Sequence, residues 1–150
     1  MTIKTMYRMN IQKTRDVKTP SRGTSLSAGI DFYVPEDFQE TTIHSGESVL
    51  IPSGIRAHVP QGYALIAFNK SGVATKQNLS VGACVVDEDY EGEIHLHLIN
   101  TGRTHTTIKP GQKLTQFILI PVSYMDVHVL EELPDRNTER GAGGFGSTGL

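Results

Sequence analysis

Short apolar runs separated by turn residues follow one another along most of the chain. Clear examples are residues 63–68, 81–86 and 114–122, each about as long as one strand. No apolar repeat with a helical period extends beyond a turn or two, which argues against long helices. The close spacing of about ten such runs predicts an all-β fold, either a distorted barrel or a jelly-roll sandwich.

Glycine, proline and small polar residues between the runs set the boundaries of the elements. We expect one short helix at residues 71–77, with Ser71 as its N-cap, because small residues follow Lys70 there. The free N–H groups at such a helix start favour an anion, although an ordinary capped helix explains the same residues. We expect strands at residues 2–13, 28–38, 41–44, 47–51, 55–59, 63–68, 81–86, 92–99, 114–122 and 124–133.

Residues 81–99, VGACVVDEDYEGEIHLHLI, have the pattern of a strand, an acidic turn and a second strand. The turn lifts Asp87, Asp89 and Tyr90 out of the core, side by side. A purely structural hairpin does not need such a set of residues. A solvated charged turn nevertheless accounts for them, so this segment alone leaves both interpretations open.

Composition narrows the class of protein. The chain has 150 residues, about one domain, and a formal net charge of -2 at pH 7. It therefore has no overall basic field for nucleic acid or an anionic membrane, and no stretch approaches ~18 apolar residues. The N-terminal residues lack the apolar core of a signal peptide, and the single cysteine, Cys84, fits a reducing compartment as a buried structural thiol. We expect an intracellular protein without a nucleic-acid or membrane partner.

Residues 139–150 form a glycine-rich tail that cannot build a core. They predict a flexible lid segment beyond a barrel domain at residues 1–138, with a disordered tail as the alternative. Arg140, Ser147 and Thr148 carry donors for phosphate, and Phe145 can stack on a planar ring. The tail is not a Walker loop, because the Gly-Lys-Ser/Thr ending is missing.

One further acid completes the set of candidate functional groups. Asp31 stands between Ile30 and Phe32, so its carboxylate either faces water or is paired. Phosphate donors, a stacking ring and the acids Asp31 and Asp87 together suit a nucleoside phosphate with Mg²⁺, for which hydrolysis is the simplest chemistry.

The chain resembles the trimeric dUTP diphosphatase family along nearly its whole length. The five family motifs appear in order as AGIDFYVPED (28–37), NKSGVATK (69–76), VGACVVDEDYEGE (81–93), GQKLTQF (111–117) and RGAGGFGSTG (140–149). The resemblance implies a jelly-roll subunit, a homotrimer with shared active sites, and Mg²⁺-dependent cleavage of dUTP to dUMP and pyrophosphate. Such an enzyme limits uracil incorporation into DNA and supplies dUMP for dTTP synthesis.

The resemblance also assigns roles to residues around the base and sugar. It implies that Asp87 holds and activates the attacking water and contacts the deoxyribose 3'-hydroxyl. It also implies that Tyr90 packs against the sugar and leaves no room for a 2'-hydroxyl. Uracil is then read by the main chain, in a slot that excludes the methyl group of thymine. The implied slot residues are Val81, Val85, Val86 and His95.

The remaining assignments concern the phosphates and the metal ion. The resemblance implies that Asp31 binds Mg²⁺ through water, and that the tail closes as a lid over a neighbouring subunit's site. Lys70, Ser71, Gly72 and Gln116 match phosphate contacts; Arg140, Ser147 and Thr148 match the γ-phosphate grip; Phe145 and Gly146 match the lid over uracil.

Several positions depart from the family pattern. Asn69 and Lys70 replace Pro-Arg in the second motif, and a lysine loses the planar fork of arginine. Lys113 stands where arginine is common, Thr115 where alanine is, and Cys84 where glycine is frequent. Asp87 and Tyr90 are unchanged, so we expect the chemistry to be retained.

Two other functions remain as alternatives. A dCTP deaminase shares the barrel but requires a different acid in place of the DEDY turn present here. A non-catalytic nucleotide-binding regulator would use the same fold without Asp87 or the tail. A metal site at His95 and His97 is weaker, because alternate residues of one strand share a face that is often a subunit contact.

Overall fold

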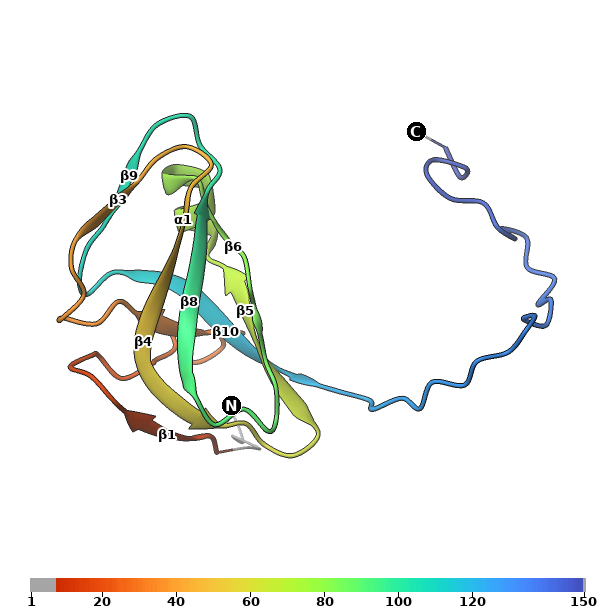
Figure 1. The fold of residues 1–150 in the computed structure, drawn as a ribbon, viewed down its shortest axis with the longest axis horizontal. Helices are drawn as coiled ribbons and strands as arrows, with labels where there is room; N and C mark the ends of the chain where they lie inside the picture. Colours follow the sequence, from red (N-terminus) through yellow and green to blue (C-terminus); the bar gives the residue numbers. More distant parts are fainter. Residues whose placement is uncertain (1–7, 150) are drawn as a thin grey trace.

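The computed structural model describes residues 8–149, which contain ten strands and one helix (Figure 1). The predicted all-β fold with one short helix is therefore confirmed. The helix α1 (Ser71–Gln77) follows β5 and precedes β6. The strands are β1 (Asn10–Lys13), β2 (Ile30–Tyr33), β3 (Thr41–Ile43), β4 (Ser48–His58), β5 (Tyr63–Asn69), β6 (Leu79–Val81), β7 (Val85–Val86), β8 (Glu93–Asn100), β9 (Thr106–Ile108) and β10 (Lys113–Pro121).

Two four-stranded antiparallel sheets enclose the core. The first has the strand order β1-β4-β8-β6 and the second β2-β10-β5-β7, while β3 pairs with β9 as a separate ribbon. Ile94, Leu96 and Leu98 on β8 are buried, as expected for one face of a strand. Phe32 of β2 and Phe117 of β10 pack with ring centroids 4.3 Å apart. Within residues 8–149, no helix has the length and apolar character to cross a bilayer.

Strand β4 is one continuous strand where the sequence predicts two, at residues 47–51 and 55–59. The expected turn at Ser53-Gly54 is instead an irregularity in its pairing with β8, where the register shifts between Pro52 and Arg56. Gly54 has a φ of 73°, which L side chains rarely adopt. The predicted turn is therefore wrong, because this position is a bulge within one strand.

The stretch expected as one strand at 81–86 is divided between the two sheets. β6 pairs with β8, so the predicted hairpin with residues 92–99 is correct only for the start of this region. β7 instead pairs with β5 in the other sheet, through Leu65–Val86 and Ile66–Val85. The chain crosses from one sheet to the other at residues 82–84, and this crossing separates the two sheets at the site described below.

Other boundaries also differ from the prediction. The helix begins after Lys70, which occupies the N-cap position without a side-chain bond; Ser71 is the first helical residue rather than the cap. The strand expected at 28–38 is limited to β2. Part of the first expected strand, residues 2–7, lies outside the described residues, and the described strand begins at Asn10.

The expected last strand at 124–133 is absent from the described residues. After β10 the chain leaves the barrel as an extended segment (Figure 1). We call residues 122–138 the arm and residues 139–149 the tail. Tyr124, Val129 and Leu133 are 70%, 84% and 81% exposed. The arm has strand-like apolar positions but no neighbouring strand to receive its hydrogen bonds, so its pattern alone does not make a strand.

Candidate active site

A cleft of about 190 Å³ opens where β6 and β7 separate. β7 is an edge strand of its sheet, so one side of its backbone has no strand partner within residues 8–149. Backbone N–H and C=O groups on such an edge are available to a ligand. The cleft is lined by Leu50, Ala83, Cys84, Val85, Val86, Asp87, Tyr90, Ile94, His95, His97 and Phe117.

The acidic turn after β7 presents two groups to this cleft. Asp87 and Tyr90 are its first and last residues, and the Tyr90 N–H donates to the Asp87 carbonyl at 3.2 Å. The Tyr90 hydroxyl donates to the Glu93 carbonyl at 2.8 Å, which fixes the ring at the start of β8. Asp87 is exposed and retains a carboxylate that can accept a proton.

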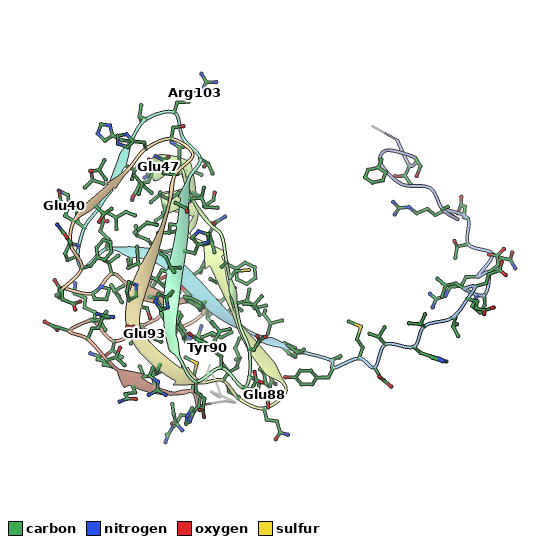
Figure 2. All side chains as sticks on the ribbon, viewed as in Figure 1. Glu40, Glu47, Glu88, Tyr90, Glu93 and Arg103 are labelled. Atoms are coloured by element: carbon green, nitrogen blue, oxygen red, sulfur yellow. The ribbon has the colours of Figure 1, made fainter. Side chains whose placement is uncertain are left out.

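Glu88 anchors the same turn from outside the cleft. One oxygen accepts the Gly62 N–H at 2.9 Å and the Tyr124 hydroxyl at 2.5 Å. These bonds, led by the one from Tyr124, lower the pKa of Glu88, and the same bond raises the pKa of the Tyr124 hydroxyl. Glu88 thereby connects the acidic turn with the first residues of the arm, at the end of the barrel that also carries Tyr90 and Glu93 (Figure 2).

Glu93 fixes the start of β8. Its carboxylate accepts two bonds from the Arg15 guanidinium, at 2.8 and 3.2 Å, one from the Thr14 hydroxyl and one from the Gly54 N–H. The hydrogen bond from Arg15 is the main reason that the pKa of Glu93 lies below its usual range. This ion pair ties the loop after β1 to the bulge of β4 and to the strand beneath the acidic turn.

A second group of polar residues surrounds the start of α1. Asp31 is 5% exposed, and its two oxygens lie 2.5 Å from the Lys70 ammonium and 3.6 Å from that of Lys113. Gln116 donates to the Asn69 carbonyl at 2.7 Å, and the Asn69 side chain accepts the Val81 N–H at 2.7 Å. The acid is paired, which is one of the two outcomes that the sequence allows, and its partners are two cations.

The residues present suit a metal ion that arrives with its ligand rather than one held by the protein. No group of three or more His, Cys, Asp or Glu side chains in residues 8–149 is placed to hold a metal ion. Mg²⁺ is commonly bound through substrate phosphates, water and one or two carboxylates. Asp31 has unused acceptor positions beyond those facing Lys70 and Lys113, so it fits water-mediated contact with such an ion.

The sequence-predicted residues fall into three groups, with Val81 apart from them. Val85, Val86, Asp87, Tyr90 and His95 line the cleft together. Lys70, Ser71, Gly72, Gln116 and Asp31 lie at the start of α1 and on the strands β10 and β2. Val81 lies outside the cleft lining, and its N–H is bound by Asn69. Arg140, Phe145, Gly146, Ser147 and Thr148 belong to the tail, which lies away from the barrel of its own chain (Figure 1).

Two residues near the site were not candidates from the sequence, and a third was a candidate only for a metal site. Lys113 contacts Asp31, Asn69 links the end of β5 to β6, and His97 lines the cleft from β8. Lys113 and Asn69 stand at departures from the family motifs, which was a usable signal. His97 was considered, together with His95, only for a weak metal site from the alternation of β8, and that pattern does not identify a cleft.

Comparison with known proteins places this fold and site in a family. A sequence profile of the dUTPase family matches residues 15–149. The deoxyuridine 5'-triphosphate nucleotidohydrolase of Desulfitobacterium hafniense (strain DSM 10664 / DCB-2) is 36% identical over 143 residues, covering 93% of each chain. The Rattus norvegicus protein of the same name is 39% identical over 140 residues, and the match covers 93% of this chain but 65% of the rat protein. The chain thus spans slightly less than two thirds of the rat sequence.

Solved structures share the fold. A mutant dUTPase of Staphylococcus bacteriophage 80alpha with dUpNHpp aligns with a TM-score of 0.85 over 95% of this chain and 99% of the phage chain, at 19% identity. A dUTPase from phage phi11 of S. aureus aligns with a TM-score of 0.76 over 85% of this chain, at 18% identity. The family profile covers nearly the whole chain and a bacterial relative of similar length shares more than a third of its residues, and the chain therefore belongs to the dUTPase family.

Proposed function

We propose that this chain hydrolyses dUTP to dUMP and pyrophosphate, with Asp87 as the general base. The observation that carries the proposal is that Asp87 and Tyr90 face one cleft beside the free edge of β7. Family membership supports the substrate class. The relatives from D. hafniense and rat are named for this reaction.

In the proposed reaction, Asp87 accepts a proton from a water molecule as its oxygen attacks the α-phosphorus. The bond from the α-phosphorus to the oxygen bridging to the β-phosphorus breaks, and pyrophosphate leaves with that oxygen. A positioned carboxylate typically contributes 10²- to 10⁴-fold to the rate of such a step. The acidic turn supports this role, because the bond between the Tyr90 N–H and the Asp87 carbonyl fixes the backbone that carries the carboxylate.

Selection of the base is proposed to occur at the edge of β7. Uracil has an N–H donor between two carbonyl acceptors, which backbone C=O and N–H groups of Val85 and Val86 can match. Cytosine presents a different order of donors and acceptors, and the methyl group of thymine needs space that a narrow slot lacks. Tyr90 is proposed to pack against the sugar and to exclude a 2'-hydroxyl.

The triphosphate is proposed to bind at the start of α1. Lys70 and Lys113 supply positive charge, and Asp31 holds their ammonium groups in place. Ser71, Gly72 and Gln116 add neutral donors. Mg²⁺ arriving with the phosphates would supply positive charge against the leaving pyrophosphate. Asp31 is proposed to orient water around that ion, and one fold relative, from phage phi11, is described with a structural Mg(II) ion.

We also propose that three chains assemble and that each tail serves a neighbouring site. The arm exposes apolar side chains along its length, among them Met125 at 85% and Val127 at 77%, which is unfavourable unless a second chain covers them. Arg140, Ser147 and Thr148 would then reach the γ-phosphate, with Phe145 and Gly146 over the base. The tail has the donors and the aromatic ring that these roles require.

The test is release of pyrophosphate from dUTP, dTTP, dCTP and UTP, with and without Mg²⁺. The proposal predicts rapid release from dUTP alone and a requirement for the metal ion. Ammonia release from dCTP is measured in parallel. Ammonia release, or no hydrolysis of dUTP by the folded protein, would contradict the proposal.

A further inference from the structure

The crossing segment, residues 82–84, lines the cleft through Ala83 and Cys84 and leads directly into β7. Each of its three residues is held by one hydrogen bond. The Gly82 N–H donates to the His97 carbonyl at 3.0 Å, and the Cys84 carbonyl accepts the Ala67 N–H at 2.8 Å. Between them, the Ala83 N–H donates to Nδ1 of the His97 ring at 2.8 Å. His97 therefore holds two of the three residues, one of them through its side chain.

The His97 ring also packs directly on the crossing segment. A Cβ atom added to Gly82 would lie 2.2 Å from Nδ1 and 2.5 Å from Cε1 of the ring. The ring thus occupies the space that any other residue at position 82 would need. Because Nδ1 accepts the Ala83 N–H, it carries no proton, and the proton of the neutral ring is on Nε2.

We propose that His97 is a positioning residue for base recognition: its ring holds the crossing segment so that β7 presents its edge at the spacing uracil requires. This inference rests on the proposed function of the cleft. His97 and the β7 residues Val85 and Val86 line the same cleft. Displacement of the crossing segment widens the slot, so binding of dUTP weakens and the methyl group of dTTP is excluded less well. The Asp87 turn is held by its own contacts, so the catalytic step changes little.

The test compares His97→Leu with His97→Asn, because the asparagine side-chain oxygen can replace Nδ1 as an acceptor. We expect His97→Leu to raise the KM for dUTP about 2- to 10-fold, the range of one net hydrogen bond, with kcat within twofold of wild type. The preference for dUTP over dTTP falls by a similar factor. In His97→Asn, we expect the KM for dUTP and the preference for dUTP over dTTP to stay within about twofold of wild type. His105→Leu, an exposed histidine on the loop before β9, is the control and leaves both unchanged.

Gly82→Ala gives a second route to the same result, because it displaces the ring while keeping the histidine. It is expected to match His97→Leu in KM and in base preference. An unchanged KM in His97→Leu, or a His97→Asn variant no better than His97→Leu, would overturn the inference. Thermal unfolding of every variant identifies any loss of the fold. If His97→Leu does not fold, the KM and base preference of Gly82→Ala and His97→Asn decide the question.

Amide hydrogen exchange at Ala83, measured without nucleotide, separates this inference from the proposed function. If the Ala83 amide exchanges faster in His97→Leu than in wild type and His97→Asn, His97 holds the crossing segment, even if the wild-type protein fails to hydrolyse dUTP. Equal exchange in all three proteins would overturn this role of His97 even if hydrolysis is normal.

Discussion

At the scale of single residues, Asp31 illustrates how a buried acid organises cations. Its side chain is nearly enclosed, and both of its oxygens face lysine ammonium groups, Lys70 and Lys113. The sequence predicts a paired or solvated acid from the apolar neighbours of Asp31. It does not identify the partners, because β10 and the start of α1 are brought to Asp31 only by the folding of the sheet.

Replacement of Lys70 tests this arrangement. Lys70→Met leaves Asp31 with one cation, so we expect stability to fall by roughly 1–3 kcal/mol and the KM for dUTP to rise about tenfold. Lys70→Arg keeps the charge and should leave turnover within a few-fold. Urea unfolding and steady-state kinetics measure these effects. A wild-type KM in Lys70→Met, or a large loss of turnover in Lys70→Arg, would contradict the assignment.

Gly29 provides a matched pair of variants near the same site. A Cβ at Gly29 would lie 2.3 Å from Oε1 of Gln116, so Gly29→Ala displaces this side chain and breaks its bond to the Asn69 carbonyl. Overpacking of this kind costs about 1–3 kcal/mol of stability. Gly23→Ala is the control, since its nearest neighbour lies 3.6 Å away. Equal unfolding midpoints for the two variants would show that this close contact carries no energetic weight.

At the scale of elements, local pattern predicted strands well but predicted their partners poorly. Residues 63–68 and 114–122 have clear apolar runs, and both form strands close to those bounds. The run at 81–86 is divided because Val85 and Val86 pair with β5, a contact that no local signal specifies. The arm has a strand-like pattern but no strand partner within residues 8–149. Sheet membership is a tertiary property, so the local pattern does not predict the crossing segment, although the motif resemblance predicts several residues that line the cleft.

The Glu93 ion pair predicts a specific response to acid. Because folding lowers the pKa of Glu93, its contribution to stability is complete above about pH 5 and is lost as pH falls through the lowered value. Glu93→Gln should therefore be less stable than wild type at pH 7, and the difference should shrink toward pH 3. Thermal unfolding across this range provides the measurement, with the exposed Glu131→Gln as a control. A constant difference at all pH values would exclude this linkage.

At the scale of the whole molecule, the barrel is complete while the arm and tail extend from it (Figure 1). The tail carries phosphate donors and an aromatic ring, but these do not meet the cleft of the same chain. The sequence predicts a separate tail from its glycine content. The role of residues 122–138 was not predicted, because an exposed apolar segment acquires a structural partner only in an assembly.

A charge on the arm tests the assembly directly. Wild-type protein should have three times the 16.4 kDa mass of one chain in light scattering after size exclusion. Leu133→Asp places a carboxylate at an apolar position that is 81% exposed in the single chain, so burial in a neighbour becomes unfavourable. We expect a lower mass and at least tenfold less activity at low protein concentration. Glu131→Asp, on the same arm, should behave like wild type; a trimer that is unaffected by Leu133→Asp would rule out this role for the arm.

The central claim is that Asp87 activates water in the cleft beside β7. The most direct test is pyrophosphate release from dUTP by wild type, Asp87→Asn and Asp89→Asn, with nucleotide binding measured for each. Asp89 lies in the same acidic turn but outside the cleft lining. We predict that Asp87→Asn still binds dUTP but loses at least about 100-fold in kcat, whereas Asp89→Asn stays within about threefold of wild type. Equal losses in both variants, or a kcat in Asp87→Asn close to that of wild type, would contradict the account.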